Sequence, residues 1–241
     1  EKIDHYEKIL PGLLLIGGIL LAGSKDNRIS PYVKNPQIVH PNPEERKEKI
    51  EKDEGISATI VQRKIEGPRV RISYPEVQGL KEEEVQGKIN GYIWEMVNKL
   101  IREQGYGAIE LQGGYEVKLN RNGILSVRFE VYSYSKGAAH GLTTVRSITV
   151  RLKDARIYAL KDLFDPDSDY INRVSEMVKK RIKAKDIPLV NEFRKINSDQ
   201  EYYLADDALV LYYQLYEYTP YAYGIPEFSI PYASIFDTID M

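Results

Sequence analysis

Apolar and polar residues alternate along several short stretches of this chain, which is the pattern of half-buried β-strands. Residues 69–74 read RVRISY, and the odd-numbered positions from Leu125 to Val131 are apolar while their neighbours are polar. Asn122-Gly123 is a strong signal for a two-residue hairpin turn. The pattern therefore predicts strands over residues 58–66, 69–74, 115–119, 124–134, 142–152 and 156–160.

Helical spacing of apolar residues marks two other stretches. Residues 81–103 carry one apolar stripe, and residues 170–184 carry a second. A further helix is predicted over residues 187–196. Trp94 lies near the first stripe, and we expect it to be part of the core. The stripes consist of Val85, Ile89, Ile93, Met96, Val97 and Leu100, and of Ile171, Val174, Val178 and Ile182.

The stretch from Glu201 to Ile235 is crowded with tyrosine. Two apolar runs flank a loop that contains Pro220 and Gly224, so we predict strand, elaborated loop, strand. Asp206-Asp207 is typical of a hairpin turn. Strands and helices come in blocks rather than in strict alternation, which predicts an α+β fold with antiparallel sheets packed by helices in two successive strand-then-helix units.

The amino-terminal part has a different character. Residues 9–23 are free of charge, but this run is shorter than the roughly 20 residues of a spanning helix and suits the core of a signal peptide or an anchor. The alternative is a buried hairpin of a soluble domain. We expect a signal-like or anchor segment over 1–24 and a polar, proline-containing linker over 25–55.

Composition narrows the function. Basic and acidic residues nearly balance, 34 against 36, so the net charge of -2 offers no reason to expect a nucleic-acid partner. The chain has no cysteine, which excludes disulfides, thiolate metal sites and cysteine nucleophiles. We expect no cofactor and no metal. Residues 165–169 are acidic, but the glycine that a calcium loop needs at its sixth position is Tyr170, and helix capping explains the same residues.

The candidate chemistry is that of binding. His140, in a glycine-rich loop, offers a hydrogen bond or a pH-sensitive charge, although a structural role is also open. The tyrosine-rich loop suits recognition, because tyrosine supplies large contact area at low entropy cost, or it packs on itself. A rival hypothesis is an enzyme acting on carbohydrate through Glu217, Glu227 and Asp206. The predicted partner-binding residues are His140, Tyr216, Glu217, Tyr218, Tyr221, Tyr223 and Glu227.

Several segments together resemble a known extracytoplasmic family. They are residues 69–80 (RVRISYPEVQGL) with 88–90 (KIN), residues 134–141 (YSKGAAHG), residues 160–164 (LKDLF), and residues 203–232 with PYA at 220–222 and GIPEF at 224–228. The chain resembles the RsiV-like and PdaC-like pair of domains of unknown function. That family includes the outer portion of a lysozyme-sensing anti-sigma factor and the non-catalytic part of a peptidoglycan deacetylase.

The resemblance implies an α+β head outside the membrane, anchored or secreted, whose work is to bind a protein or cell-wall glycan. It places a smaller amino-terminal domain over 56–135 and the RsiV-like domain over 136–241. Only eight residues precede the apolar segment, and no deacetylase domain follows, so we expect the binding or sensing head alone. The resemblance favours a non-enzymatic function. An accessory domain of cell-envelope assembly is a further alternative.

Overall fold

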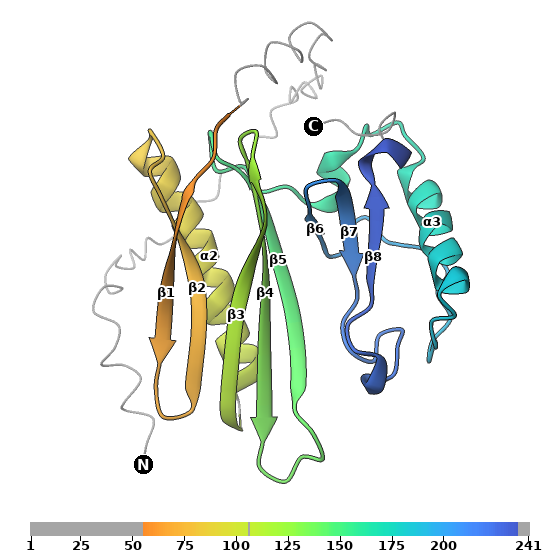
Figure 1. The fold of residues 1–241 in the computed structure, drawn as a ribbon, viewed down its shortest axis with the longest axis horizontal. Helices are drawn as coiled ribbons and strands as arrows, with labels where there is room; N and C mark the ends of the chain where they lie inside the picture. Colours follow the sequence, from red (N-terminus) through yellow and green to blue (C-terminus); the bar gives the residue numbers. More distant parts are fainter. Residues whose placement is uncertain (1–54, 106, 236–241) are drawn as a thin grey trace, which may run out of the picture. The chain divides into compact units, whose positions relative to one another are not determined.

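A computed structural model describes residues 55–105 and 107–235 of the chain. The expected anchor over 1–24 and nearly all of the expected linker over 25–55 lie outside the described residues. None of the helices within the described ranges is long and apolar enough to cross a membrane. Over these residues the fold consists of a five-stranded and a three-stranded sheet with two α-helices, and its α+β class is the one predicted (Figure 1).

The five-stranded sheet has the order β1-β2-β3-β4-β5. β2 and β3 are parallel, because the helix α2 carries the chain back between them, and the other neighbours are antiparallel. At the β3–β4 turn Asn122 and Gly123 both have positive φ, 50° and 74°, as the predicted tight hairpin requires. The strands are β1 (Thr59–Glu66), β2 (Val70–Gln78), β3 (Ala108–Arg121), β4 (Ile124–Ser135) and β5 (Leu142–Arg151).

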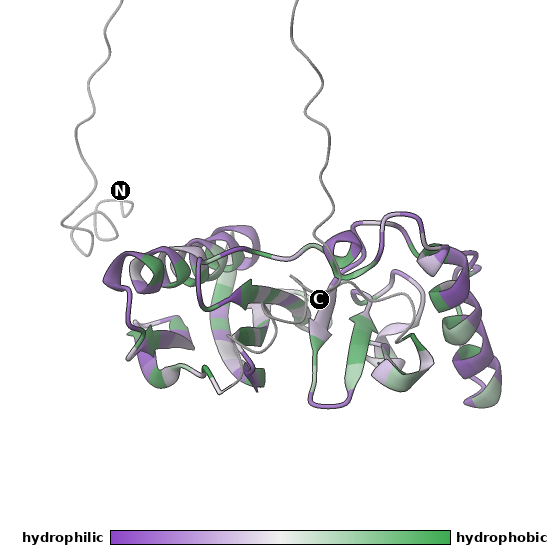
Figure 2. Ribbon diagram, turned by 90° about the horizontal axis from the view of Figure 1, so that it is seen from above, coloured by the Kyte–Doolittle hydropathy of each residue, from purple (hydrophilic) through white to green (hydrophobic). Residues whose placement is uncertain are grey.

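Helix α2 (Glu83–Gly105) covers one face of this sheet, as Figure 2 shows. Its buried stripe meets the alternating apolar positions of β4, so the predicted helix and the predicted strand bury each other. Trp94 does not belong to this core: its side chain is 37% exposed, and the prediction of a core tryptophan was wrong. The stripe is Ile89, Ile93, Val97 and Leu100, and the β4 residues are Leu125, Val127, Phe129 and Val131.

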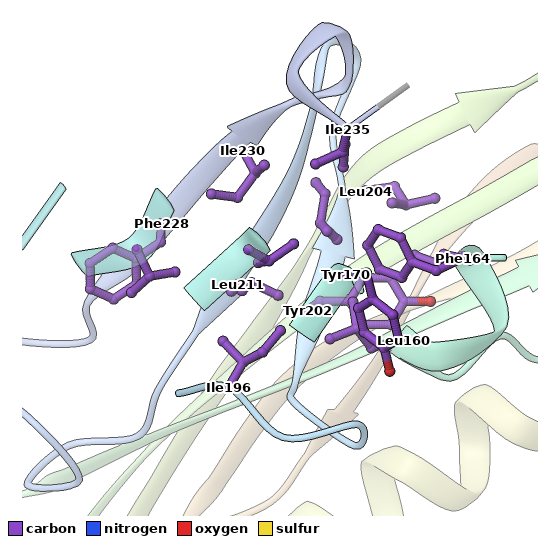
Figure 3. Packing of buried hydrophobic residues seen from close by; sticks show 14 of the residues in the cluster. Leu160, Phe164, Tyr170, Ile196, Tyr202, Leu204, Leu211, Phe228, Ile230 and Ile235 are labelled. Atoms are coloured by element: carbon purple, nitrogen blue, oxygen red, sulfur yellow. The ribbon is translucent and has the colours of Figure 1, made fainter. Parts of the chain in front are cut away.

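The second half contains helix α3 (Tyr170–Ala184), at the bounds predicted, and a sheet of order β6-β7-β8. Its strands are β6 (Tyr202–Leu204), β7 (Ala208–Tyr212) and β8 (Glu227–Pro231). Side chains from α3, all three strands and the segments before them form one apolar core, part of which is shown in Figure 3. The turn between β6 and β7 lies at Asp206-Asp207, as predicted.

Buried contacts join the two sheets. The Leu204 N–H of β6 donates to Ser126 Oγ of β4 over 3.0 Å, and Ser126 Oγ also bonds to Thr149 Oγ1 of β5 over 2.9 Å. Val145 of β5 packs with Tyr203 and other apolar residues of the small sheet. β5 itself follows residue 135, where we expected the domain boundary, and pairs with β4 along its whole length.

Two predicted elements were wrong. Residues 156–160 make only an isolated bridge between Ile157 and Val150. They then turn into a 3-10 helix, η2 (Leu160–Leu163), which carries its buried leucines into the second core. Residues 187–196 form no helix. Pro188 lacks an N–H and disfavours helix at the residue before it, and the Ile196 N–H is satisfied by Ser175 Oγ of α3 instead.

Candidate partner-binding surface

Two loops far apart in the sequence meet in the structure. One connects β4 to β5 and contains residues 136–141; the other connects β7 to β8 and contains the 3-10 helix η3 (Tyr221–Tyr223). Figure 1 shows both loops below the strands that they connect. Local sequence shapes each loop, because Gly137 and Gly224 have φ of 84° and 85°, which favours glycine.

His140 lies where the two loops touch. Its ring stacks on Tyr221 with a centroid distance of 3.9 Å and an interplanar angle of 24°. Its Nδ1 lies 2.9 Å from the Gly141 carbonyl oxygen, and its Nε2 lies 3.1 Å from the Tyr216 hydroxyl. A carbonyl oxygen only accepts, so Nδ1 carries the proton of the neutral ring, and Nε2 accepts from Tyr216.

Tyr216 combines an unusual backbone conformation with an exposed side chain. Its φ is 66°, a left-handed conformation that costs a bulky residue about 1–3 kcal/mol and that persists where the surroundings impose it, often at functional sites. Its side chain is 48% exposed, and that of Tyr223 is 41% exposed. We call His140, Tyr216, Tyr221 and Tyr223 the aromatic surface.

Gln214 secures the tyrosine loop to the edge of the larger sheet. Its side-chain amide accepts from the Val145 N–H of β5 over 3.1 Å and donates to the Val145 carbonyl over 2.8 Å, as a neighbouring strand would. The same amide nitrogen donates to the Glu201 carboxylate over 2.6 Å. Glu217 in turn accepts from the Gln214 N–H over 3.0 Å. The loop is therefore ordered before any partner arrives.

Tyr218, one of the predicted binding residues, faces inward. Its ring meets Tyr213 edge-on at 4.7 Å and Phe193 at 5.4 Å, both of them part of the second core. Burial raises the pKa of its hydroxyl. The tyrosine loop was expected either to present its rings for recognition or to pack on itself. The structure shows both features in one segment, because some of its tyrosines pack inward and others are exposed.

The three carboxylates of the rival enzyme hypothesis each have different partners in the structure. Glu217 caps the loop, and burial raises its pKa. Glu227 of β8 accepts from Arg128 Nε over 3.1 Å and from the Tyr203 hydroxyl over 2.9 Å, away from the aromatic surface. Asp206 pairs with Arg121 at 3.6 Å. Two cavities of the described structure lie along α2, one lined by residues that include Tyr92 and Arg146 and the other by Tyr74 and Trp94 among others. None of the three carboxylates lines either cavity, so the rival enzyme gains no support from this geometry.

A neighbouring apolar segment was missed. Leu189 and Val190 are 38% and 52% exposed. The Val190 N–H donates to the Tyr218 carbonyl over 2.9 Å, and Asn191 Nδ2 donates to the Glu217 carbonyl over 2.8 Å, so this segment runs alongside the tyrosine loop. The wrong prediction of a helix concealed it, although Pro188 was a signal against that helix.

The acidic stretch before α3 is a local turn. Asp165 Oδ1 accepts from the Asp167 N–H over 2.9 Å, and Asp169 makes no side-chain capping bond to the α3 backbone. Helix capping, expected as an explanation of these acidic residues, is therefore not what the structure shows at the N-cap residue Asp169. Across the described ranges no three side chains of metal-ligand type gather in a possible metal site.

Two family models match successive parts of the chain. The one described as protein of unknown function (DUF3298) matches residues 161–233, which include α3 and the small sheet. The one described as deacetylase PdaC matches residues 62–143, which include α2 and most of the larger sheet. The contact between His140 and Tyr221 therefore joins one matched region to the other.

Among characterised proteins, the chain is 28% identical over 181 residues to the anti-sigma-V factor RsiV of Bacillus subtilis. The match takes in 67% of this chain and 62% of RsiV, so the chain spans less than two thirds of that relative's length. Together with the two family matches, this similarity supports an RsiV-like and PdaC-like pair of domains.

Two crystal structures share the fold. A member of the DUF3298 family from Bacteroides fragilis superposes with a TM-score of 0.55 at 18% identity and covers 78% of this chain and 95% of its own. A DUF3298 family protein from Pseudomonas aeruginosa PAO1 gives 0.58 at 15% identity and covers 78% and 96%. At such identities the likeness concerns the fold.

Proposed function

We propose that this chain is a non-enzymatic, extracytoplasmic sensing head that binds a cell-wall-active protein of the lysozyme type through the aromatic surface. Its similarity to an anti-sigma factor supports a sensing role. The charge-free run at residues 9–23 and the polar stretch after it are the sequence features that support a position outside the cytoplasmic membrane.

The observation that carries the proposal is the stacking of His140 on Tyr221, with Tyr216 bonded to the same imidazole. Residues 76 positions apart in sequence build one patch, and most of its rings remain accessible. Binding hot spots are enriched in tyrosine, and a patch that is already ordered loses little entropy on binding. A loop that served only to pack on itself would not keep Tyr216 and Tyr223 exposed.

The surroundings of the patch favour a protein partner. Leu189 and Val190 add exposed apolar side chains on the segment that runs alongside the tyrosine loop. Exposed apolar area that is contiguous and rimmed by polar groups is characteristic of protein–protein interfaces. Peptidoglycan is the second ligand to test, because the tyrosine rings also suit stacking on sugars.

The test is calorimetric titration of the purified chain with a lysozyme-type hydrolase and, separately, with soluble peptidoglycan fragments. The variants Tyr216→Ala and Tyr221→Ala are compared with Ile109→Ala, which truncates a side chain of similar exposure on β3. We expect each tyrosine variant to weaken binding of the hydrolase about 30-fold or more, as hot-spot residues do, and the control to bind like the parent.

Several results would sink the proposal. If micromolar hydrolase does not bind, or binds equally to all variants, the aromatic surface is not the site of a lysozyme-type partner. Binding of peptidoglycan fragments alone, with the same loss in the tyrosine variants, would keep the surface and replace the partner class. Hydrolysis of the fragments that is lost in Glu227→Gln would favour the rival enzyme.

A further inference from the structure

A second aromatic site lies on the opposite half of the molecule, at the edge of the region that α2 covers. α2 packs on β2, β3, β4 and β5, whereas every residue of β1 is exposed or half-buried. β1 is the edge strand and pairs with β2, on which α2 packs. A cavity of about 200 Å³ opens there, and it is lined by Tyr74, Pro75, Glu76, Asn90 and Trp94.

The cavity has an aromatic wall. The rings of Tyr74 on β2 and Trp94 on α2 lie 5.6 Å apart between centroids, at 50° to each other. Trp94 is 37% exposed, and the Tyr74 hydroxyl makes no hydrogen bond to a described residue. A solitary exposed aromatic side chain needs no ligand, but two rings angled into one cavity form an apolar platform.

Planar polar groups border this platform. Both carboxylate oxygens of Glu76 accept from Arg63, at 2.7 and 2.9 Å, and one also accepts from Gln78 Nε2 at 2.7 Å. The hydrogen bond from Arg63 lowers the pKa of Glu76 to about 2, so the carboxylate is charged at physiological pH. The third guanidinium nitrogen, Arg63 Nη1, has no partner among the described residues.

Asn90, which lines the cavity, connects helix α2 to strand β2. Its side-chain amide accepts from the Val77 N–H over 2.8 Å and donates to the Val77 carbonyl over 2.9 Å. These two bonds tie α2 to β2 at the cavity itself. The distance between Tyr74 and Trp94 is therefore set by the fold rather than by a ligand.

We propose that the cavity of Tyr74, Glu76 and Trp94 binds a carbohydrate, with one pyranose ring stacked on the aromatic pair. A pyranose has faces of C–H groups and a rim of hydroxyls. The faces match the rings of Trp94 and Tyr74, and the hydroxyls donate to Glu76 and accept from Arg63. The site goes beyond the proposed recognition of a protein, because it shares no residue with the aromatic surface.

The chain supplies its own probe, since Trp94 is its one tryptophan. The full chain is titrated with β-1,4-linked N-acetylglucosamine tetramer, cellotetraose and maltotetraose, and intrinsic tryptophan fluorescence is recorded. We expect a saturable change with at least one of these sugars. Glu76→Gln and Tyr74→Leu should each weaken that sugar about tenfold, the latter because it keeps apolar volume but removes the ring. Circular dichroism verifies that both variants are folded.

Tyr216→Ala is the matched control, because it removes an exposed ring from the aromatic surface alone. We expect it to bind the sugar like the parent, and we expect Glu76→Gln to bind the hydrolase like the parent, so the two proposals fail separately. The carbohydrate site is overturned if none of the three sugars changes Trp94 fluorescence at sugar concentrations up to about 10 mM. A dissociation constant above that concentration would mean negligible affinity. It is also overturned if the change persists in both Glu76→Gln and Tyr74→Leu.

Discussion

At the scale of single residues, two tyrosines near each other in the fold differ in one hydrogen bond: Tyr202 lies on β6, and Tyr213 directly follows β7. Both Tyr213 and Tyr202 are buried and belong to the second core. The Tyr202 hydroxyl donates to the Tyr158 carbonyl over 2.7 Å, whereas the Tyr213 hydroxyl has no partner within the described structure. A buried hydroxyl without a partner destabilises the fold, because it gives up its bonds to water.

The same substitution should therefore have opposite effects at the two positions. We expect Tyr213→Phe to raise the free energy of unfolding by about 1 kcal/mol and Tyr202→Phe to lower it by about 1 kcal/mol or more. Urea denaturation followed by circular dichroism measures both. A loss of stability in Tyr213→Phe would mean that its hydroxyl is satisfied in solution.

The lowered pKa of Glu76 predicts that the stability of the fold depends on pH in the acidic range. Its carboxyl has a pKa of about 2 in the folded chain, mainly because of the hydrogen bond from Arg63, against an ordinary value of 4.5. Because the pKa is lowered, the stabilisation is fully present above about pH 4.5 and is lost as the pH falls towards 2. The pair is exposed, so salt should weaken the effect.

Urea denaturation at a series of pH values from about 6 to about 2 tests this linkage. We expect Glu76→Gln to flatten the fall in stability over that window. Glu82→Gln removes an exposed negative charge that has no ion pair among the described residues, and it is the charge-matched control. Equal pH profiles for Glu76→Gln and the parent chain would contradict the prediction.

At the scale of elements, β5 is an edge strand, and a side chain forms some of the hydrogen bonds that a further strand would form with it. The Gln214 side chain forms hydrogen bonds with the N–H and the carbonyl of Val145. Further along the same edge, the Tyr158 N–H donates to the Thr149 carbonyl. The edge is thereby partly closed to other chains, and the tyrosine loop is attached to it. The position of His140 against Tyr221 depends on this attachment.

We expect Gln214→Ala to leave the Val145 N–H and carbonyl unpaired and to lower the free energy of unfolding by about 1–3 kcal/mol. Hydrogen exchange of the Val145 amide should become faster, and binding at the aromatic surface should weaken with it. Gln112→Ala, at an exposed position of β3, should change stability by less than about 0.5 kcal/mol. Unchanged exchange at Val145 would show that Gln214 does not hold the edge.

At the scale of the whole molecule, the described residues belong to one compact unit. The buried bonds from Ser126 to Leu204 and Thr149, and the packing of Val145 with Tyr203, connect the sheet matched by one family with the sheet matched by the other. Neither half can lose its structure without exposing those groups. We therefore expect the halves to unfold together.

Two spectroscopic probes can test this cooperativity. Trp94 fluorescence reports α2 in the first half, and near-ultraviolet circular dichroism is dominated by tyrosines, most of which crowd the second half. We expect coincident urea transitions, and we expect Ser126→Ala to shift both midpoints equally. Two separated transitions would show that the halves are independent domains.

Much of the fold followed from local pattern. The bounds of α3, the helix α2, the hairpin at Asn122-Gly123 and the α+β class were predicted correctly, because period and turn chemistry are local properties of the chain. The helix over 187–196 was wrong, because contacts with α3 and the tyrosine loop satisfy the backbone there. The binding roles of His140 and the tyrosine-loop residues stay predictions.

What the sequence alone determined was which residues are suited to recognition: a histidine in a glycine-rich loop and a tyrosine-rich loop. Only the tertiary structure decided which of them act together. It turned Tyr218 inward, bonded Glu227 to Arg128 and stacked His140 on Tyr221. It also brought Trp94 out of the core to face Tyr74. The reason is physical. The spacing of apolar residues indicates which side chains favour burial, whereas the exposure of each side chain depends on which other element covers it.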